Sequence, residues 1–245
     1  MERFRLVTLD MVGTVIRFSR PPVAEYQAAA ARRGLNMELT PLQQSFNRRW
    51  AEMNRDFPHF GSTSGLSSQA WWERLVKETY SGVLAPGQQD PHTLTCLASE
   101  LYTYYRGPEP YLVTQDGLET LQRLSQAGTT VGVISNFDTR LLDILPALGL
   151  SKYIDFVVTS EEARSSKPEP AIFEIARRQS GLAGLQVEQI LHIGDDLDRD
   201  YLGARGLGWS AVLVDRWGGG YTTVDQNHVL NIITDIFNPE ITGCL

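Results

Sequence analysis

The chain has 245 residues, of which 42% are hydrophobic and 21% are charged, and its formal net charge is −7. This length and composition allow a substantial buried core, and they suit one α/β domain with a smaller attached unit. The acidic balance offers no basic excess of the kind that nucleic-acid binders carry, and no apolar run is long enough for a transmembrane helix. Cys96 and Cys244 are the only cysteines, and they form neither a metal-binding spacing nor a disulfide framework.

The first residues lead almost at once into a strand-like segment, which leaves no room for a signal peptide. We therefore expect a cytoplasmic protein that does not associate with membranes, and that is a monomer or a weak dimer. The first predicted strand covers residues 4–10 and stops before Gly13. No strand signal follows between about residues 17 and 105, where apolar spacing predicts four helices, at 23–33, 42–53, 69–80 and 92–105. Thr40, followed by a proline, is the predicted N-cap of the second of these helices.

Beyond residue 105 the pattern alternates between amphipathic segments and short β-branched runs. Helices are predicted at residues 116–126, 139–148, 170–179 and 202–206. Strands are predicted at residues 129–135, 154–159, 189–193 and 211–214. This alternation is typical of βαβ units and of a parallel sheet buried on both faces. The predicted fold is therefore α/β, a Rossmann-like doubly wound parallel sheet formed by residues 1–16 and 107–245, with an inserted all-helical cap domain at 17–106.

Polar residues follow the predicted strands at their carboxyl ends, which is where open parallel sheets bind ligands. Asp10 ends the first strand, Ser135 and Asn136 end the second, and Lys167 precedes a later helix. Each of these features has a plain structural explanation when taken singly, as a turn former, a cap or a surface side chain.

The last of these strand ends carries a run of carboxylates, with Asp195, Asp196 and Asp200 following Gly194. Carboxylates this close together repel one another unless a cation offsets their charge. The simplest explanation is a hard divalent cation with oxygen ligands, most readily Mg²⁺.

Taken in order, an aspartate, a Ser-Asn pair, a lysine and a paired aspartate at successive strand ends resemble the haloacid dehalogenase (HAD) superfamily. The resemblance covers essentially the whole chain, because the helical insertion is similar to the C1 cap of that superfamily. It implies a hydrolase, most often a phosphatase, with a small phosphorylated metabolite as substrate and Mg²⁺ as cofactor.

Residue by residue, the resemblance implies that Asp10 attacks phosphorus and that Ser135 holds the phosphoryl oxygens, while Lys167 neutralises developing charge. Gly13, Thr14 and Asn136 would contribute to substrate binding.

The same resemblance implies a metal site made by Asp10, the backbone carbonyl of Val12, and Asp195. Asp196 or Asp200 would orient these ligands from behind. Mg²⁺ in this position would brace the transferring phosphoryl group.

Val12 departs from the pattern of phosphatases in this superfamily, which have a second aspartate at that position to protonate the leaving group. Loss of a general acid typically costs about 10²–10⁴-fold in rate. Three explanations stay open: a substrate with a good leaving group, a substitute acid such as Asp138 or a cap carboxylate, or a pseudoenzyme that binds without turnover.

Two related chemistries also do without the second aspartate. A 2-haloacid dehalogenase needs no acid, although Gly194-Asp195 resembles metal-using members. A phosphonatase needs a cap lysine, and the sole candidate, Lys77, is better explained by a local pair with Glu73. In the cap, His59 is the candidate contact with the substrate, while the aromatic residues fit a core and His192 fits a satisfied buried residue of its strand.

Overall fold

The computed structural model describes residues 4–214, so that Cys244 lies outside the described part of the chain. Contacts divide the described residues into two compact units. The first unit contains residues 4–17, 113–137 and 145–214, and the second contains Phe18–Leu112 together with Asp138–Ile144. Relative to the predicted domain ranges, 107–112 and 138–144 group with the helical unit. No helix in residues 4–214 has the length and apolar character that a membrane span requires.

The first unit is built on a five-stranded parallel sheet, in the order β5-β4-β1-β6-β7. The strands are β1 (Leu6–Leu9), β4 (Thr130–Ser135), β5 (Phe156–Thr159), β6 (Ile190–Gly194) and β7 (Ser210–Leu213). All five coincide with predicted strands, because their continuous apolar runs match burial on both faces. The predicted doubly wound α/β fold is confirmed.

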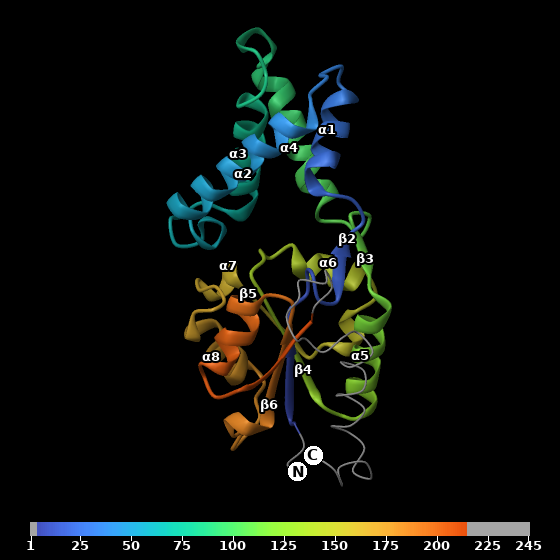
Figure 1. Ribbon diagram of the computed structural model, residues 1–245, viewed down its shortest axis with the longest axis vertical. Helices are drawn as coiled ribbons and strands as arrows, with labels where there is room; N and C mark the ends of the chain where they lie inside the picture. Colours follow the sequence, from blue (N-terminus) through green and yellow to red (C-terminus); the bar gives the residue numbers. More distant parts are fainter. Residues whose placement is uncertain (1–3, 215–245) are drawn as a thin grey trace. The chain divides into compact units, whose positions relative to one another are not determined.

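Helices α5 (Gln115–Gln126) and α8 (Pro170–Gln179) lie on opposite faces of this sheet (Figure 1). The core on the α8 side contains alternate strand residues such as Leu6 and Ile190, packed against Phe173 and Trp209. Shorter helical segments complete the unit, namely α6 (Leu141–Ala147, shared between the units), α7 (Ser160–Ala163), a π-helical turn at Leu197–Leu202, and α9 (Gly203–Arg205). The sequence predicts a helix only at residues 202–206, so the π-helical turn that precedes α9 was not predicted.

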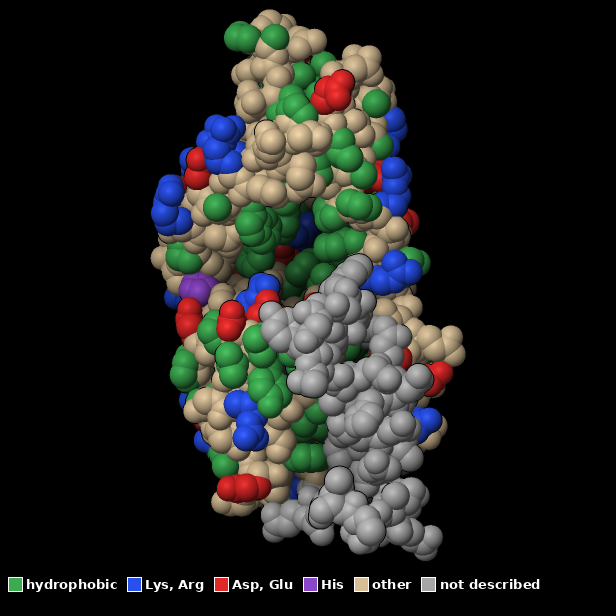
Figure 2. Space-filling view, viewed as in Figure 1, with side chains coloured by type: hydrophobic (Ala, Val, Ile, Leu, Met, Phe, Trp, Pro, Cys, Tyr) green, Lys and Arg blue, Asp and Glu red, His purple; other side chains and the backbone are tan. Residues whose placement is uncertain are grey.

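The second unit is built on four helices, α1 (Pro22–Ala31), α2 (Leu39–Asp56), α3 (Ser68–Ser81) and α4 (Pro91–Tyr104). Thr40 is not the N-cap of α2, because Glu38 is the last extended residue and the helix begins at Leu39. Thr40 and Pro41 therefore lie in the first turn, where proline is tolerated. Figure 2 shows acidic and basic side chains interspersed on the surface of this unit, in keeping with ion pairs such as Arg49–Glu52 and Arg74–Glu78.

One pair of strands was not predicted. β2 (Ile16–Phe18) pairs with β3 (Tyr111–Val113), so the expectation of no strand from residue 17 is wrong. Strands of three residues are too short to show a period of two, and this pair is held by partners that are distant in sequence. The chain passes from the first unit into the second within β2 and returns within β3.

Candidate active site

The candidate site lies at the carboxyl ends of three adjacent strands, β4, β1 and β6. β1 is central, and the later strands β6 and β7 add on the side opposite to β4 and β5, so the strand order reverses at β1. Ligands bind at such a reversal in open α/β sheets. The backbone N–H of Asp10 donates to the carbonyl of Ile193 at 2.9 Å, which extends the register of β1 and β6 up to the site.

Asp10 is the centre of the cluster and is 7% exposed. Its Oδ1 accepts a hydrogen bond from Ser135 Oγ at 3.2 Å and lies 2.7 Å from Lys167 Nζ. Within the described residues Oδ2 accepts no hydrogen bond. One oxygen is therefore held in place while the other remains available to a metal ion or to an electrophile.

Lys167 is almost fully buried, and its ammonium group has three acceptors. These are Asp10 Oδ1 at 2.7 Å, the carbonyl of Ile134 at 2.7 Å and Asp200 Oδ1 at 2.6 Å. An ammonium group has three N–H donors, so each has a partner. The cation is thus fixed beside Asp10 from the side of β4.

The side chain of Asn136 positions Lys167 by binding the backbone of that lysine. Its Oδ1 accepts from the N–H of Lys167 at 2.8 Å, and its Nδ2 donates to the carbonyl of Lys167 at 2.9 Å. Both ends of the amide are therefore used inside the protein. The sequence predicts substrate binding by Asn136, whereas the geometry gives its side chain a supporting contact.

The turn after β1 brings Gly13 against Asp195. Gly13 has a φ of +104°, and a Cβ at this position would lie 2.2 Å from Asp195 Oδ2. Only glycine fits both the backbone conformation and the close approach. Thr14 donates from Oγ1 to Asp195 Oδ1 at 3.4 Å, so this turn holds the carboxylate from the side of β1.

The remaining aspartates of the run have different orientations. Asp196 turns toward its own helical turn, where it accepts from the N–H groups of Asp198 and Arg199 and pairs with the Arg199 guanidinium. Asp200 turns inward and is 2% exposed, with Oδ2 accepting from the N–H of Asp196 at 3.0 Å. Of the two candidates for a supporting role, Asp200 is the one that joins Asp10 and Lys167.

Burial and charge shape the ionisation of these groups. Burial, reinforced by the neighbouring Asp200, raises the pKa of Asp10 to about 6, although Lys167 opposes the shift. Burial and the charge of Asp200 likewise raise the pKa of Asp195. Burial also acts on Asp200, but the charge of Lys167 and the hydrogen bond from His192 hold the pKa of Asp200 well below its usual value.

The donor set fits a hard divalent cation. Asp10, Asp195 and Asp200 each offer a carboxylate oxygen, and these oxygens lie within 4.8 Å of one another. Burial is the main reason that the pKa values of Asp10 and Asp195 are raised, and the charge of Asp200 adds to the effect. A bound cation with oxygen ligands would favour the ionised form of both carboxyls. The residues present can therefore hold a metal ion such as Mg²⁺.

Val12, two residues beyond Asp10, is partly exposed and forms a backbone bridge with Ile16. Its side chain carries no proton to donate.

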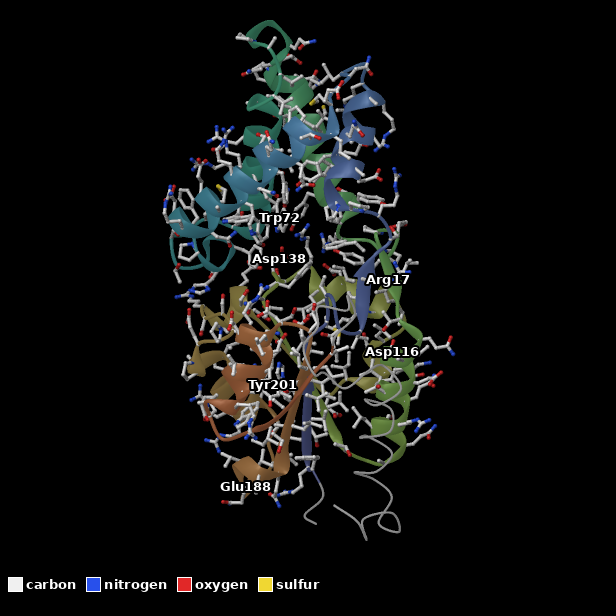
Figure 3. All side chains as sticks on the ribbon, in the orientation of Figure 1. Arg17, Trp72, Asp116, Asp138, Glu188 and Tyr201 are labelled. Carbon is white, nitrogen blue, oxygen red and sulfur yellow. The ribbon has the colours of Figure 1, made fainter. Side chains whose placement is uncertain are left out.

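Asp138, one predicted substitute, is fully buried and makes a bidentate ion pair with Arg140 at 2.7–2.9 Å. It also accepts from the indole N–H of Trp72, and the two side chains lie side by side in Figure 3. With both oxygens in use, Asp138 is poorly suited to act as the missing acid.

The cap residues singled out by the sequence belong to the second unit. His59 lies in a 3₁₀ turn with a φ of +51°, and its predicted contact with the substrate stays a prediction. The tryptophans form a packed cluster: Trp71 is fully buried against Met53, Phe60 and Leu75, with Trp50 and Trp72 alongside. This agrees with the expectation that these aromatic residues form a core.

The contact between His192 and Asp200 was not predicted from the sequence. His192 is fully buried, as predicted, but its Nε2 lies 3.1 Å from Asp200 Oδ1, which places it directly behind the candidate site. The alternation of side chains along β6 could have indicated its face, but not its partner. Asp200 reaches it only because the π-helical turn carries that side chain back toward the strand.

A buried aspartate beside a serine, a lysine and further aspartates, at the strand ends of a doubly wound sheet, is the arrangement that the resemblance to haloacid dehalogenase-like hydrolases led us to expect. The family model of haloacid dehalogenase-like hydrolases matches residues 4–208. The chain belongs to this family.

Among individual relatives, haloacid dehalogenase-like hydrolase domain-containing protein 3 from Bos taurus is 37% identical over 212 residues, which cover 86% of this chain and 82% of the relative. Solved structures with a similar fold include a HAD phosphatase from Thermococcus onnurineus, with a TM-score of 0.61 and 21% identity over 94% of this chain and 97% of that one. A 2-haloacid dehalogenase from Pseudomonas syringae has a TM-score of 0.63 and 20% identity, covering 94% of this chain and 98% of that one. These two likenesses concern the fold.

Proposed function

We propose that this chain is a Mg²⁺-dependent hydrolase of phosphate monoesters and acyl phosphates, with Asp10 as the nucleophile. The observation that carries the proposal is the asymmetry of Asp10. Lys167 and Ser135 hold one of its oxygens, and the other accepts no hydrogen bond from residues 4–214 and lies beside two further carboxylates. A fixed, partly neutralised carboxylate with one open oxygen suits in-line attack on phosphorus.

In the first step Asp10 Oδ2 forms a bond to phosphorus as the bond to the leaving oxygen breaks, and the leaving group takes the electron pair. We expect the positive charge of Lys167 to offset the negative charge on the transferring group. We also expect the Ser135 hydroxyl, which donates to Asp10 Oδ1 in the free site, to turn to a phosphoryl oxygen. In the second step water attacks the phosphorus of the aspartyl-phosphate, which releases inorganic phosphate and regenerates Asp10. Mg²⁺ held by Asp10 and Asp195, with the Val12 carbonyl, would supply positive charge that strengthens this stabilisation.

The leaving group limits the first step. Val12 has no proton to give, and Asp138 is committed to Arg140 and Trp72. The carboxylate of an acyl phosphate and the phenolate of an aryl phosphate can leave without protonation, whereas the alkoxide of an alkyl phosphate cannot. We therefore expect the rate to fall steeply as the pKa of the leaving group rises.

The test is phosphate release from alkyl, aryl and acyl phosphates, with and without Mg²⁺, from the wild type and from Asp10→Asn. Asp198→Asn is the matched control, since Asp198 is exposed in the same acidic run. Release that requires both Mg²⁺ and Asp10, and that is unchanged in the control, supports the proposal. Release that persists in Asp10→Asn contradicts it.

The valine at position 12 also favours a second candidate, a protein that binds phosphorylated ligands without turnover. In that case no substrate releases phosphate, while inorganic phosphate still binds in the presence of Mg²⁺. Dehalogenation is the third candidate, since halide leaves without an acid and one neighbour of similar fold is a dehalogenase. It predicts halide release from 2-haloacids that persists when a chelator removes the metal.

A further inference from the structure

A continuous chain of buried hydrogen bonds runs behind the candidate site. Thr8 on β1 lies 2.8 Å from His192 Nδ1, and His192 Nε2 lies 3.1 Å from Asp200 Oδ1. Asp200 in turn contacts the ammonium group of Lys167, which contacts Asp10. Thr8 and His192 are paired in the register of β1 and β6, so both side chains project from the same face of the sheet.

The groups at the two ends of this chain of hydrogen bonds determine which atoms of His192 carry a proton. The Asp200 carboxylate is ionised and can only accept hydrogen bonds, so His192 must donate to it from Nε2. The Thr8 hydroxyl lies 2.8 Å from Nδ1, closer than its other acceptor, the carbonyl of Leu191 at 3.4 Å. The Thr8 hydroxyl therefore donates to Nδ1, which is the acceptor nitrogen of the ring. The donor at one end and the acceptor at the other thus select a single tautomer.

Packing does not explain why a histidine occupies this position. His192 is fully buried between Leu191 and Ile193 in a strand whose other residues are apolar or glycine. A buried polar ring is costly unless its nitrogen atoms have partners. The imidazole packs perpendicular to the ring of Phe173, at 5.4 Å between centroids and an interplanar angle of 84°, and this contact restricts the ring plane. Both partners and packing thus direct one N–H at Asp200.

We propose that His192 is a positioning residue for the reaction, because its Nε2–H holds the Asp200 carboxylate in the orientation that places Lys167 beside Asp10. Asp200 Oδ1 is shared between His192 and Lys167, so the first contact restricts where the second can form. Oδ2 is fixed separately by the N–H of Asp196. Without the imidazole donor the carboxylate can rotate, and Lys167 loses its defined third acceptor.

The kinetic test compares His192→Leu, which removes the donor, with His192→Gln, whose amide N–H can reach Asp200. This arm rests on the proposed function, since it measures phosphate release. A hydrogen bond to a charged group contributes enough that we expect kcat to fall about tenfold or more in His192→Leu, with KM changed less than about threefold. His192→Gln should recover most of kcat. Trp209→Phe is the packing control, because Trp209 touches the same Phe173 and its indole N–H has no partner among the described residues.

Equal losses in His192→Leu and His192→Gln, or an equal loss in Trp209→Phe, would overturn the proposal, since packing alone would then explain them. Thr8→Val provides a milder variant that keeps the β-branched shape and removes only the hydroxyl donor. If His192→Leu does not fold, Thr8→Val decides, with a smaller fall in kcat expected and an unchanged kcat counting against the proposal.

A second arm does not depend on turnover. The chain has three lysines, so nitrogen NMR of ¹⁵N-lysine-labelled protein can resolve the buried Lys167 ammonium from the half-buried Lys77 and the exposed Lys152. We expect this signal to shift or to exchange away in His192→Leu and to stay unchanged in Trp209→Phe. Imidazole ¹⁵N shifts of the wild type should show Nε2 protonated and Nδ1 unprotonated. The opposite tautomer, or a Lys167 signal indifferent to His192, would overturn the proposal even if no phosphatase activity were found.

Discussion

The ionised carboxylate of Asp10 destabilises the folded protein at neutral pH. Burial together with the charge of Asp200 raises its pKa from 3.8 to about 6, against the opposing effect of Lys167. Below about pH 4 the carboxyl is protonated in both folded and unfolded protein, and above about pH 6 it is ionised in both. Between these values only the folded protein keeps the proton, so stability decreases as the pH rises through this window. The lowered pKa of Asp200 acts at more acidic pH, where it makes stability fall as the pH falls.

Asp10→Asn should therefore stabilise the metal-free protein above pH 6, by about 1–3 kcal/mol. The free energy of unfolding of this variant should also no longer decrease between about pH 4 and 6. Urea unfolding across this pH range in the presence of a chelator measures both effects. Asp198→Asn, in which an exposed carboxyl is replaced, should leave the pH profile of the wild type unchanged. A less stable Asp10→Asn protein at pH 7 would contradict this account.

Val12 occupies the position where a general acid is missing from the site. Val12→Asp should raise the rate with alkyl phosphates about tenfold or more, because a general acid contributes about 10²–10⁴-fold where it is well placed. Aryl and acyl phosphates should gain less, since their leaving groups need no proton. Initial rates over a series of leaving groups measure the difference.

Val12→Asn is the matched control, since its side chain has the shape of aspartate but no ionisable proton. It should leave the alkyl phosphate rate near that of the wild type. A flat response in both variants would show that Val12 does not limit this site.

At the scale of elements, the segment Asp138–Ile144 holds two ion pairs with contrasting surroundings. Arg140 and Asp138 are 3% and 0% exposed, and the guanidinium also stacks on the rings of Trp72 and Tyr102. Arg106 and Asp143 are 57% and 47% exposed. Breaking a buried pair leaves an uncompensated charge, whereas an exposed pair contributes little.

Asp138→Asn should lower the free energy of unfolding by about 2–4 kcal/mol, and Asp143→Asn by less than about 1 kcal/mol. Urea unfolding monitored by tryptophan fluorescence provides the comparison, because Trp72 donates its indole N–H to Asp138. Similar losses in the two variants would mean that burial does not distinguish these pairs.

For the molecule as a whole, a metal ion should stabilise the two units unequally. The candidate ligands Asp10, Asp195 and Asp200 all belong to the first unit, and each unit has a hydrophobic core of its own. A ligand at 100 times its Kd stabilises the folded state that binds it by about 2.7 kcal/mol. Regions that open locally, without unfolding of the whole, do not share this gain.

Mg²⁺ should therefore slow hydrogen–deuterium exchange in β1, β4 and β6 more than in α3 and α4. Mass spectrometry of exchanged peptides measures both sets in one sample. Asp195→Asn should abolish the difference, since it removes a carboxylate that faces the others. Equal protection of the two units would show that they unfold as a single cooperative body.

Much of this architecture follows from local sequence. The five strands of the sheet and the longer helices α5, α6 and α8 were predicted because buried parallel strands are apolar runs and their helices are amphipathic, whereas the short α7 and the π-helical turn were not. β2 and β3 were missed, and Thr40 was misassigned as a cap, because short strands and exact helix ends depend on contacts with distant residues. The order of polar residues at the strand ends was enough to indicate the family and to single out Asp10, Lys167 and Asp195.

The sequence by itself determined the class of fold, the identity of the residues near the site and the absence of an acid at Val12, since these depend on residue type and spacing along the chain. Only the tertiary structure decided which oxygen of Asp10 is held, that Asn136 supports Lys167, and that Asp200 rather than Asp196 turns inward. It also linked His192 to the site. These are matters of side-chain direction between strands far apart in sequence, and a hydrogen bond depends on distances and angles that no spacing along one strand can specify.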